Sequence, residues 1–581
     1  EQFRGPDDHW LPPDNYQEEP LAVLARRTSP TNIGLGLLSI LSAYDFGYLD
    51  LTQLLARLNN TFDRMRGLER YRGHFLNWYE TRELHPLNPR YVSTVDSGNL
   101  AGSLLTLASG LENLDKVALS GGKLVQGIAD TLSVVAETLQ PANPNAVSTE
   151  IDEITVQIHQ LRERLEIGAE RDSWWQTIDD IYERDVPALQ ERVLALIERD
   201  ESFSAESLGR LRHWLDELHQ HAVVARRYQE NLEPWQRLLR APPVACREQG
   251  SQAAESFRAL TEILDAPVTL NTLDHRCAQA SSQLDALKHV LTAVSEEQKE
   301  GAQAWCARLR TALVIAQDNA DIYRNDLQRL AARAREWVRE MDFAFLYDRE
   351  RHLFHIGYNV TEASLDANYY DLLASESRLT GFIAVAKGDV PARHWQHLER
   401  PFRRMRRRVV LMSWSATLFE YLMPRLLMET PDHSLMGRAC RNAIEVHRDF
   451  ASHFGVPWGI AESGFYELDS QMHYQYRAFG VPGIGFRRDL GERLVIAPYA
   501  SMMALPFCAD VVMENLRQLR NHGGYGQFGL HEAIDFGRTA RPAPRRARTV
   551  RSYMSHHQGM ILLAINNYLH GDVMLQRFHS D

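Results

Sequence analysis

Carboxylates set among aromatic residues and glycines are the feature of this sequence best suited to chemistry. The segment WGIAESGFYELD places Glu462 between an Ile-Ala pair and a Ser-Gly pair, with Trp458 and Tyr466 on either side. A buried core has little need for the acid, and a solvated loop has little need for the rings. This mixture is typical of a site that binds a ligand with an apolar face and a polar edge.

Carbohydrates are a ligand class that requires this mixture. Sugar faces stack on aromatic rings, sugar hydroxyls need acidic, amide and guanidinium partners, and cleavage of a glycosidic bond needs two carboxyl groups. Glu376 follows Asp371 in YYDLLASESRL at a spacing that does not place both on one helical face, and Glu420 lies between two aromatic residues. Any one acid is more often a structural hydrogen-bonding group than a catalyst. The other acids in aromatic or glycine-rich settings are Asp96, Glu532 and Asp535.

Other reaction chemistries have weaker signals. His556 and His557 are adjacent in the sequence, and adjacent side chains on a helix diverge, whereas side chains four residues apart could converge on a metal ion. The chain has no HExxH and no GxSxG motif, and its glycine runs lack the strand-to-helix setting of a phosphate loop. We therefore expect neither a metal ion nor a cofactor.

Composition limits the class of protein. With 581 residues, the chain is expected to form several domains or one large barrel with an insertion. A formal net charge of −12 argues against a general nucleic-acid surface, and no apolar run is long enough to predict a membrane span. Five scattered cysteines indicate thiols in a reducing compartment. Because the chain begins at Glu1 without Met, we interpret it as a piece of a longer or processed polypeptide.

Helices are expected to position the candidate residues. Apolar stretches rich in Gly, Ala and Ser predict close-packed helices that begin near Ser29 and span 49–68 and 92–111. Residues 345–360 predict a β-hairpin, and loops rich in Gly and aromatic residues separate the later helices. This arrangement favours a helical barrel with its function in the loops. The later helices are predicted near 367–387, 416–429, 435–454, 508–522 and 550–569.

The pattern changes between residues 141 and 340. Apolar residues recur there at spacings of three and four, as from Leu208 to Leu218, and mostly charged residues lie between them. This pattern predicts a separate helical module with a supporting role. The predicted division is residues 1–140 as the first part of the barrel, 141–340 as the inserted module, and 341–581 as the rest of the barrel with the catalytic loops.

Several long motifs occur along the chain in this order: RTSPTNIGL, YYDLLASESRLTGFIAVAKGDVP, SWSATLFEYLMP, VPWGIAESGF, YQYRAFGVPGIGF and RSYMSHHQGM. Together they resemble the central domain of cyclic β-1,2-glucan synthases, in the glycoamylase-like group called glycoside hydrolase family 189. The resemblance covers roughly 10–110 and 341–575, while 141–340 matches only in its helical character and its place. It implies an all-α fold: an (α/α)6 barrel with a large helical insertion and short β-hairpins in the loops.

The resemblance implies a transglycosylase that cuts linear β-1,2-glucan and re-forms a β-1,2 bond within the same chain, releasing a ring. Breaking one such bond and making another retains the anomeric configuration, which usually requires a nucleophile and an acid/base about 5–5.5 Å apart. Matching the motifs implies Glu376 and Glu462 as this pair, with their individual roles open. Related families on this fold invert. An endo-β-1,2-glucanase and a non-catalytic glucan-binding domain are the alternatives.

The resemblance also implies a substrate cleft and a setting for this chain. Glu420 is the strongest third carboxylate, expected to position sugar or water. The expected partners are a β-1,2-glucan and the glycosyltransferase and phosphorylase-like regions of a larger synthase, on the cytoplasmic side of the bacterial inner membrane. Core packing is an equal alternative for the individual cleft residues. The other expected substrate-binding residues are Trp78, Tyr79, Tyr370, Trp414, Trp458, Tyr466, Tyr474, Tyr476, Asp96, Asn99, Arg477, Glu532 and His556.

Overall fold

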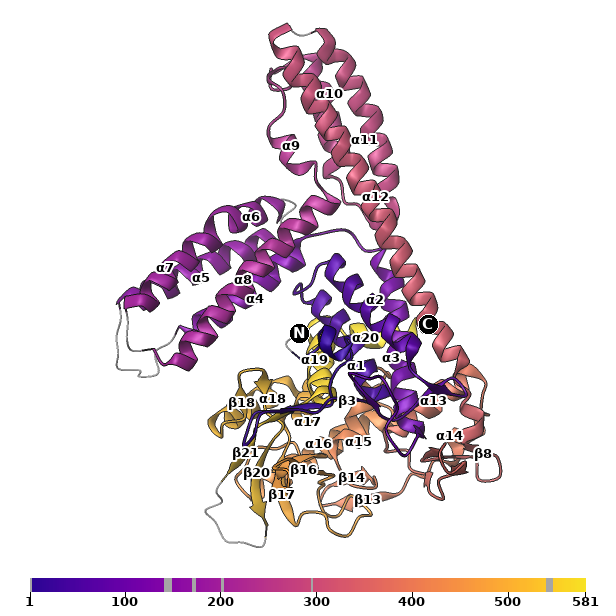
Figure 1. Cartoon of the computed structure of the whole chain (residues 1–581). Helices are drawn as coiled ribbons and strands as arrows, with labels where there is room; N and C mark the ends of the chain where they lie inside the picture. The colour runs from indigo at the N-terminus through magenta and orange to yellow at the C-terminus, as the bar shows by residue number, and fades with distance from the viewer. Residues whose placement is uncertain (1–2, 140–148, 170–173, 200–202, 294–295, 540–546) are drawn as a thin grey trace. The chain divides into compact units, whose positions relative to one another are not determined.

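The computed structural model describes residues 3–139, 149–169, 174–199, 203–293, 296–539 and 547–581. Helices contain most of these residues, and the strands form small, separate sheets (Figure 1). The chain packs into two compact units. The predicted three-part division stays a prediction, and its first boundary, at residue 140, lies outside the described residues. The first unit comprises Glu1–Ser42, Arg57–Gly110 and Leu330–Asp581, and the second comprises Ala43–Ala56 and Leu111–Arg329.

The first unit contains the helices and loops with the candidate residues. Its strands are two to six residues long and mainly form hairpins. The helices wholly or mainly within it are α1 (Pro30–Asp45), α2 (Leu51–Gly67), α3 (Thr94–Leu114), α13 (Ser377–Lys387), α14 (Arg393–His397), α15 (Leu418–Leu422), α16 (Leu435–His453), α17 (Pro498–Met502), α18 (Leu505–Asn521), α19 (Ser555–Leu569) and α20 (Val573–His579).

Small residues explain how α3 packs so closely on α13. A side chain at Gly98 of α3 would place its Cβ 1.9 Å from the Thr380 hydroxyl oxygen, which no real contact allows. Gly102, one turn later, faces Leu379 and Ile383 at distances that only a glycine tolerates without a shift. The stretch rich in Gly, Ala and Ser near 92–111 therefore forms a close-packed helix, as its sequence predicts.

The N-terminus of α1 also agrees with the sequence. Ser29 precedes the helix, and its hydroxyl oxygen accepts a hydrogen bond from the Asn32 amide at 3.1 Å. Pro30 occupies the first helical position, where no hydrogen-bonded N–H is needed. This cap fixes the start of α1, so that Thr31 and Asn32 lie at the end of the helix that borders the candidate site.

Two predicted helices begin later than the sequence indicates. A helix is predicted near 367–387, but α13 begins at Ser377, because the backbone before it bridges Leu372 to Glu399 and Ala374 to Ser413. A helix is predicted near 550–569, but strand β22 precedes α19 and pairs with β1. In both cases partners distant in the sequence determine the backbone, and a local apolar pattern contains no sign of them.

The strands mostly pair within hairpins. The predicted hairpin over 345–360 is confirmed, with β8 and β9 paired through Asp348 and Leu353. The strands are β1 (Asn15–Gln17), β2 (Val23–Leu24), β3 (Arg27–Thr28), β4 (Arg70–Tyr71), β5 (His74–Phe75), β6 (Tyr79–Glu80), β7 (Tyr91–Ser93), β8 (Tyr347–Asp348), β9 (Leu353–His355), β10 (Gly357–Asn359), β11 (Ser364–Leu365), β12 (Tyr369–Tyr370), β13 (Phe402–Met405), β14 (Arg408–Leu411), β15 (Ser463–Leu468), β16 (Tyr474–Arg477), β17 (Arg493–Ile496), β18 (Tyr525–Gly526), β19 (Gly529–Leu530), β20 (Ala533–Arg538), β21 (Arg548–Val550) and β22 (Ser552–Met554).

The second unit is built from amphipathic helices. Within it α4 packs on α5 and α8, and α10 packs on α11. Leu211, Leu215 and Leu218 are fully or almost fully buried, as their spacing predicts. The helices are α4 (Gly122–Thr138), α5 (Thr149–Ala169), α6 (Trp174–Asp180), α7 (Val186–Arg199), α8 (Ala205–Leu232), α9 (Gln236–Arg240), α10 (Gln252–Asp265), α11 (Leu270–Val290) and α12 (Glu296–Glu340), the last of which continues into the first unit.

Candidate functional site

Glu376 and Glu462 line the same cavity of about 240 Å³ in the first unit. Glu376 is the N-cap of α13, and Glu462 immediately precedes β15. Both carboxyl side chains are half-buried, so protein surrounds them while the cavity still reaches them. The other residues that line the cavity are Ser29, Thr31, Trp78, Val95, Asp96, Asn99, Phe419, Tyr476, His556 and Met560.

Glu376 lies among polar groups from α1 and α3. The Asn99 amide donates to its carboxyl oxygen Oε2 at 3.4 Å, and the Thr31 hydroxyl donates to Asp96 at 2.6 Å. Burial, followed by the negative charges of Glu462 and Asp96, raises the pKa of Glu376 well above its ordinary value. The Asn99 hydrogen bond acts in the opposite direction and is the smaller effect. Glu376 therefore holds its proton more strongly than an ordinary Glu does.

Glu462 has a different environment. Burial raises its pKa to about 7, and the charges of Glu420 and Glu532 add to the increase. A hydrogen bond from the Tyr476 hydroxyl to the carboxyl opposes it, because this bond stabilises the ionised form. The Tyr499 hydroxyl donates to the Glu462 backbone carbonyl at 2.9 Å and so fixes the segment before β15.

The hairpin of β15 and β16 brings Tyr476 to Glu462. Tyr476 lies opposite Gly464 in the antiparallel register. A Cβ at Gly464 would lie 3.2 Å from the Cγ atom of Glu532 and 3.3 Å from Val550, closer than most real contacts. A glycine at this position thus lets the strand approach β20 and β21 closely.

Glu420 stabilises a helix and does not line the cavity. Its carboxylate accepts hydrogen bonds from the Ser413 hydroxyl at 2.9 Å, the Ser415 amide at 3.0 Å and the Thr417 amide at 3.0 Å. With Thr417 it forms the capping box of α15. Its negative charge still acts on Glu462 and Glu376. A direct contact of Glu420 with sugar or water stays a prediction.

Replacing Glu420 with Ala is expected to lower the free energy of unfolding by about 1–3 kcal/mol, because buried donors lose their acceptor. The loss of its charge should also lower the pKa of Glu462. Urea unfolding followed by circular dichroism measures the first effect. The matched control is Glu514→Ala, which removes an exposed carboxylate that pairs only with exposed Arg517 among the described contacts. Equal midpoints for the two variants would contradict the assigned cap.

Glu532 and His557 form a buried pair that contacts β15, the strand that follows Glu462. Glu532 is 2% exposed, and its carboxylate accepts from the Gly464 amide at 3.0 Å and lies 3.0 Å from His557 Nδ1. The Tyr499 ring stacks on the His557 ring with centroids 3.6 Å apart. Burial raises the pKa of Glu532 to about 7 and lowers that of His557 to about 3. The structure thus places Glu532 inside the protein and outside the lining of this cavity, and its contact with substrate stays a prediction.

The sequence offers only a partial signal for this pair. The adjacent His556 and His557 diverge on α19, as their spacing predicts: His556 lines the cavity and its Nδ1 lies 3.1 Å from Asn32, whereas His557 faces Glu532. Sequence reasoning did not single out Tyr499 or Asn32. Among the described residues, no group of three His, Cys, Asp or Glu side chains is arranged to hold a metal ion.

Several other predicted substrate-binding residues gather at the cavity. Trp78, Asp96, Asn99, Tyr476 and His556 line it directly. The Arg27 guanidinium lies 4.9 Å from the centre of the Trp78 ring and holds its orientation. Burial, and then the charges of Glu376 and Asp96, raise the pKa of Tyr370, so its hydroxyl stays protonated close to the two acids.

Other predicted contacts do not line this cavity. Tyr79 is fully buried, and its hydroxyl donates to the Glu69 carbonyl. Trp458 is 6% exposed, and its backbone makes two hydrogen bonds to Asn515. These two rings are core residues in the structure, so stacking of sugar on them has no support.

The remaining predicted residues lie on neighbouring loops. Tyr466 and Tyr474 pack against each other on the β15–β16 hairpin with centroids 5.6 Å apart. Arg477 pairs with Asp489, and Trp414 is largely exposed. Their contacts with substrate stay predictions.

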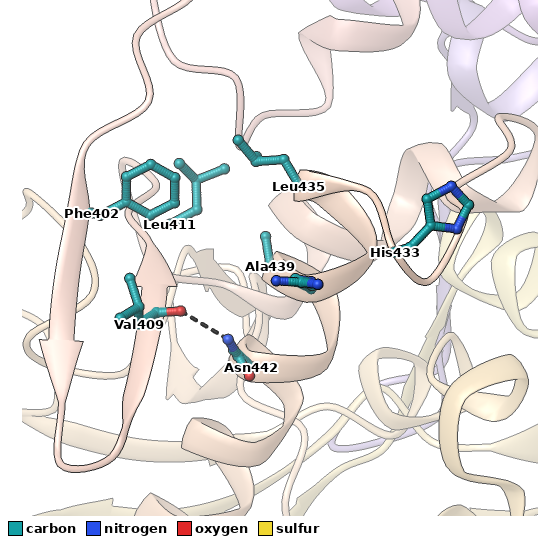
Figure 2. Close-up of a pocket in the computed structure, with 8 residues that line it drawn as sticks. Phe402, Val409, Leu411, His433, Leu435, Ala439 and Asn442 are labelled. Carbon is teal, nitrogen blue, oxygen red and sulfur yellow. Dashed lines mark hydrogen bonds between the residues drawn. The ribbon is translucent and has the colours of Figure 1, made fainter.

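A larger hollow in the first unit lacks the carboxyl groups that cleavage of a glycosidic bond needs. Figure 2 shows this hollow of about 460 Å³ between the β13–β14 hairpin and α16, where the Asn442 amide donates to the Val409 carbonyl at 2.8 Å. No carboxylate lines it, so the smaller cavity with Glu376 and Glu462 is the candidate site. The hollow is lined by Phe402, Val409, Leu411, His433, Leu435, Arg438, Ala439 and Asn442.

Comparison with known proteins shows which families this chain resembles. Residues 368–581 match the Glycoamylase family, described as "Putative glucoamylase". The whole chain is 34% identical to the cyclic β-(1,2)-glucan synthase NdvB of Rhizobium meliloti (strain 1021), but it spans only 18% of the length of that protein.

Solved structures show the same fold at low sequence identity. An endo-β-1,2-glucanase from Chitinophaga pinensis matches with a TM-score of 0.52 at 10% identity, over 100% of this chain and 92% of that one. A "putative glucoamylase" from Bacteroides fragilis matches with a TM-score of 0.51 at 12% identity, over 99% and 89%. The predicted helical-barrel fold class is thereby confirmed. The chain is a relative of one segment of a cyclic β-(1,2)-glucan synthase, and its C-terminal part is glycoamylase-like, as its motifs indicate.

Proposed function

We propose that this chain is an anomer-retaining transglycosylase that cuts linear β-1,2-glucan and re-forms a β-1,2 bond within the same chain to release a ring. The observation that carries the proposal is the pair of carboxyl groups, Glu376 and Glu462, on one cavity with raised pKa values. The relationship to a cyclic β-(1,2)-glucan synthase supplies the substrate class.

The two carboxyl groups would act in two displacements. First, Glu376 donates its proton to the glycosidic oxygen while the Glu462 carboxylate attacks C1, so the C1–O bond breaks and a glycosyl–enzyme ester forms. Second, a 2-hydroxyl at the far end of the same chain attacks C1, Glu376 takes its proton, and the Glu462 carboxylate leaves. Glu462 is assigned as nucleophile because the Tyr476 hydrogen bond favours its ionised form.

The products test the reaction directly. Incubation with linear β-1,2-glucan is expected to give rings without an increase in reducing ends, measured by mass spectrometry and a reducing-sugar assay. Short linear sugars with a matching increase in reducing ends would instead identify an endo-β-1,2-glucanase, in which water takes the glycosyl unit. Binding of the glucan without any product would identify a glucan-binding domain.

The dependence of activity on pH should follow the two acids. Glu462 must be ionised to attack, so kcat/KM should fall as the pH drops below about 7. Glu376 must be protonated to donate, and because its pKa is raised, activity at high pH should be lost at a higher pH than an ordinary Glu would allow. The optimum should therefore lie well above the pKa of about 4.3 of an ordinary Glu. A profile of kcat/KM against pH with its acid limb near 4 would contradict these environments.

The partners and location of this chain are part of the proposal. Because the chain spans 18% of its relative, we infer that it works beside other regions of a longer polypeptide, namely glycosyltransferase and phosphorylase-like regions at the cytoplasmic side of a bacterial inner membrane. None of the helices among the described residues has the length and apolarity needed to cross a bilayer. Fractionation of cells that express the full-length protein, with an antibody against this chain, would place it in the membrane or the soluble fraction.

A further inference from the structure

Two exposed aromatic rings stack on each other in the loops after β14 and β16. Trp414 is 60% exposed and Phe486 is 45% exposed, and their ring centroids are 6.4 Å apart with an angle of 28° between the planes. Large exposed apolar groups that lie together usually mark a binding surface, whereas single ones need no explanation. We call Trp414 and Phe486 the aromatic platform.

The aromatic platform is held in place by its backbone. The Phe486 amide donates to the carbonyls of Ser413 at 3.3 Å and Trp414 at 3.1 Å. A Cβ at Gly480 would lie 1.7 Å from the Ser415 carbonyl oxygen, so the loop after β16 packs directly on the loop with Trp414. A preformed surface of this kind loses little conformational entropy when a ligand binds.

The same loops lead to the cavity. The Ser413 hydroxyl and the Ser415 amide, on both sides of Trp414, donate to the Glu420 carboxylate, whose charge acts on Glu462. On the other side, Arg487 donates to the carbonyl of Ala478 at 3.1 Å, two residues after Tyr476 in the cavity wall. The loops that carry the aromatic platform are thus hydrogen-bonded to Glu420 and to the segment that follows Tyr476 in the cavity wall.

The cavity is too small to enclose a polymer, so most of a bound glucan would lie on the surface outside it. A volume of about 240 Å³ is below the roughly 300–1,000 Å³ of pockets that enclose a drug-sized ligand, so a polymer must continue beyond the cavity. Charged groups lie next to the platform: Arg487 follows Phe486 in the sequence, and both Arg487 and Arg477 pair with Asp489. Exposed rings with polar groups at their edge suit the faces and hydroxyls of sugar units.

We propose that the aromatic platform is an outer subsite for β-1,2-glucan, where it holds glucosyl units remote from the bond that reacts. This inference rests on the proposed function, since it takes β-1,2-glucan as the ligand. The platform favours long chains over short ones, because only a long chain reaches it from the cavity. Its loss therefore weakens the binding of long glucans and leaves the binding of short ones unchanged.

The experiment compares binding and turnover of short and long linear β-1,2-glucans. Trp414→Ala and Phe486→Ala, each combined with Glu462→Gln to prevent turnover, are expected to bind long glucan about tenfold more weakly by titration calorimetry. Binding of a short oligosaccharide should not change. The matched control is Tyr568→Ala, which removes a 50% exposed ring about 18 Å along α19 from His556.

The outcomes separate this inference from the proposed function. Equal binding of long glucan by the platform variants and the control would overturn the platform alone. If the wild type binds long glucan but yields no product, the proposed reaction fails, and the binding comparison still decides the platform. If the wild type binds no β-1,2-glucan, both fail. Trp414→Phe keeps a ring and should restore most of the binding; failure to do so would show that stacking is not the cause and would overturn the platform.

Discussion

Glu462→Ala is expected to reduce turnover of β-1,2-glucan by roughly 10⁴-fold or more while binding persists, because the step that forms the glycosyl–enzyme loses its nucleophile. Glu376→Gln should reduce turnover by about 10²–10⁴-fold, the usual contribution of a general acid. Rates of product formation and glucan binding by calorimetry measure the two effects. Full activity in either variant would remove that residue from the reaction.

Azide distinguishes the two roles. In Glu462→Ala the anion fits the space left by the carboxylate and attacks C1 of a β-linked unit, so the expected product is an α-glycosyl azide. In Glu376→Ala the ester to Glu462 still forms from a substrate with a good leaving group, and azide then attacks the ester to give a β-glycosyl azide. The opposite pattern would exchange the roles of Glu376 and Glu462, and the absence of both azides would argue against double displacement.

The matched control for these variants is Glu514→Gln. Glu514 is exposed on α18, and its described ion pair is with exposed Arg517. An unchanged rate in this variant would show that loss of a carboxylate affects turnover only at the cavity. Melting temperatures near that of the wild type in all four variants, Glu376→Ala included, would exclude unfolding as the cause.

Part of the fold follows from local sequence pattern. α16 spans Leu435–His453, almost the range predicted, because its apolar residues recur at helical spacing and Ser434 caps it by accepting from the Gly437 amide. By contrast, the apolar residues before Glu376 suit a helix or a strand equally. Their bridges to Glu399 and Ser413 decide the matter, and these partners are remote in the sequence.

The candidate site, like the fold, could be predicted only in part from the sequence. The sequence motifs indicated Glu376 and Glu462 as a pair, and in the structure both line one cavity. Their supporting groups were harder to foresee, because the sequence does not show which face a ring or acid adopts. Trp458 and Tyr79 have the composition of sugar-binding residues but pack in the core, and Glu532 turns inward to His557.

Tyr476→Phe is expected to reduce kcat/KM by about 10- to 100-fold, because a hydrogen bond to a charged group contributes about 1.5–3 kcal/mol. The hydroxyl stabilises ionised Glu462, so its removal should raise the pKa of that carboxyl. The acid limb of the profile of kcat/KM against pH should therefore move to higher pH. The ring is retained, so stacking against sugar should change little.

Tyr499→Phe shows whether Tyr476 acts on the ionisation of Glu462 or on the position of its loop. The Tyr499 hydroxyl donates to the backbone carbonyl of Glu462, not to its carboxyl group. Its loss should lower kcat by releasing the segment before β15, while the acid limb stays closer to that of the wild type than in Tyr476→Phe. If both variants moved the acid limb equally, Tyr476 would act by holding the loop. If neither moved it, ionisation of Glu462 would not control the acid limb, and the nucleophile would have to be sought at Glu376.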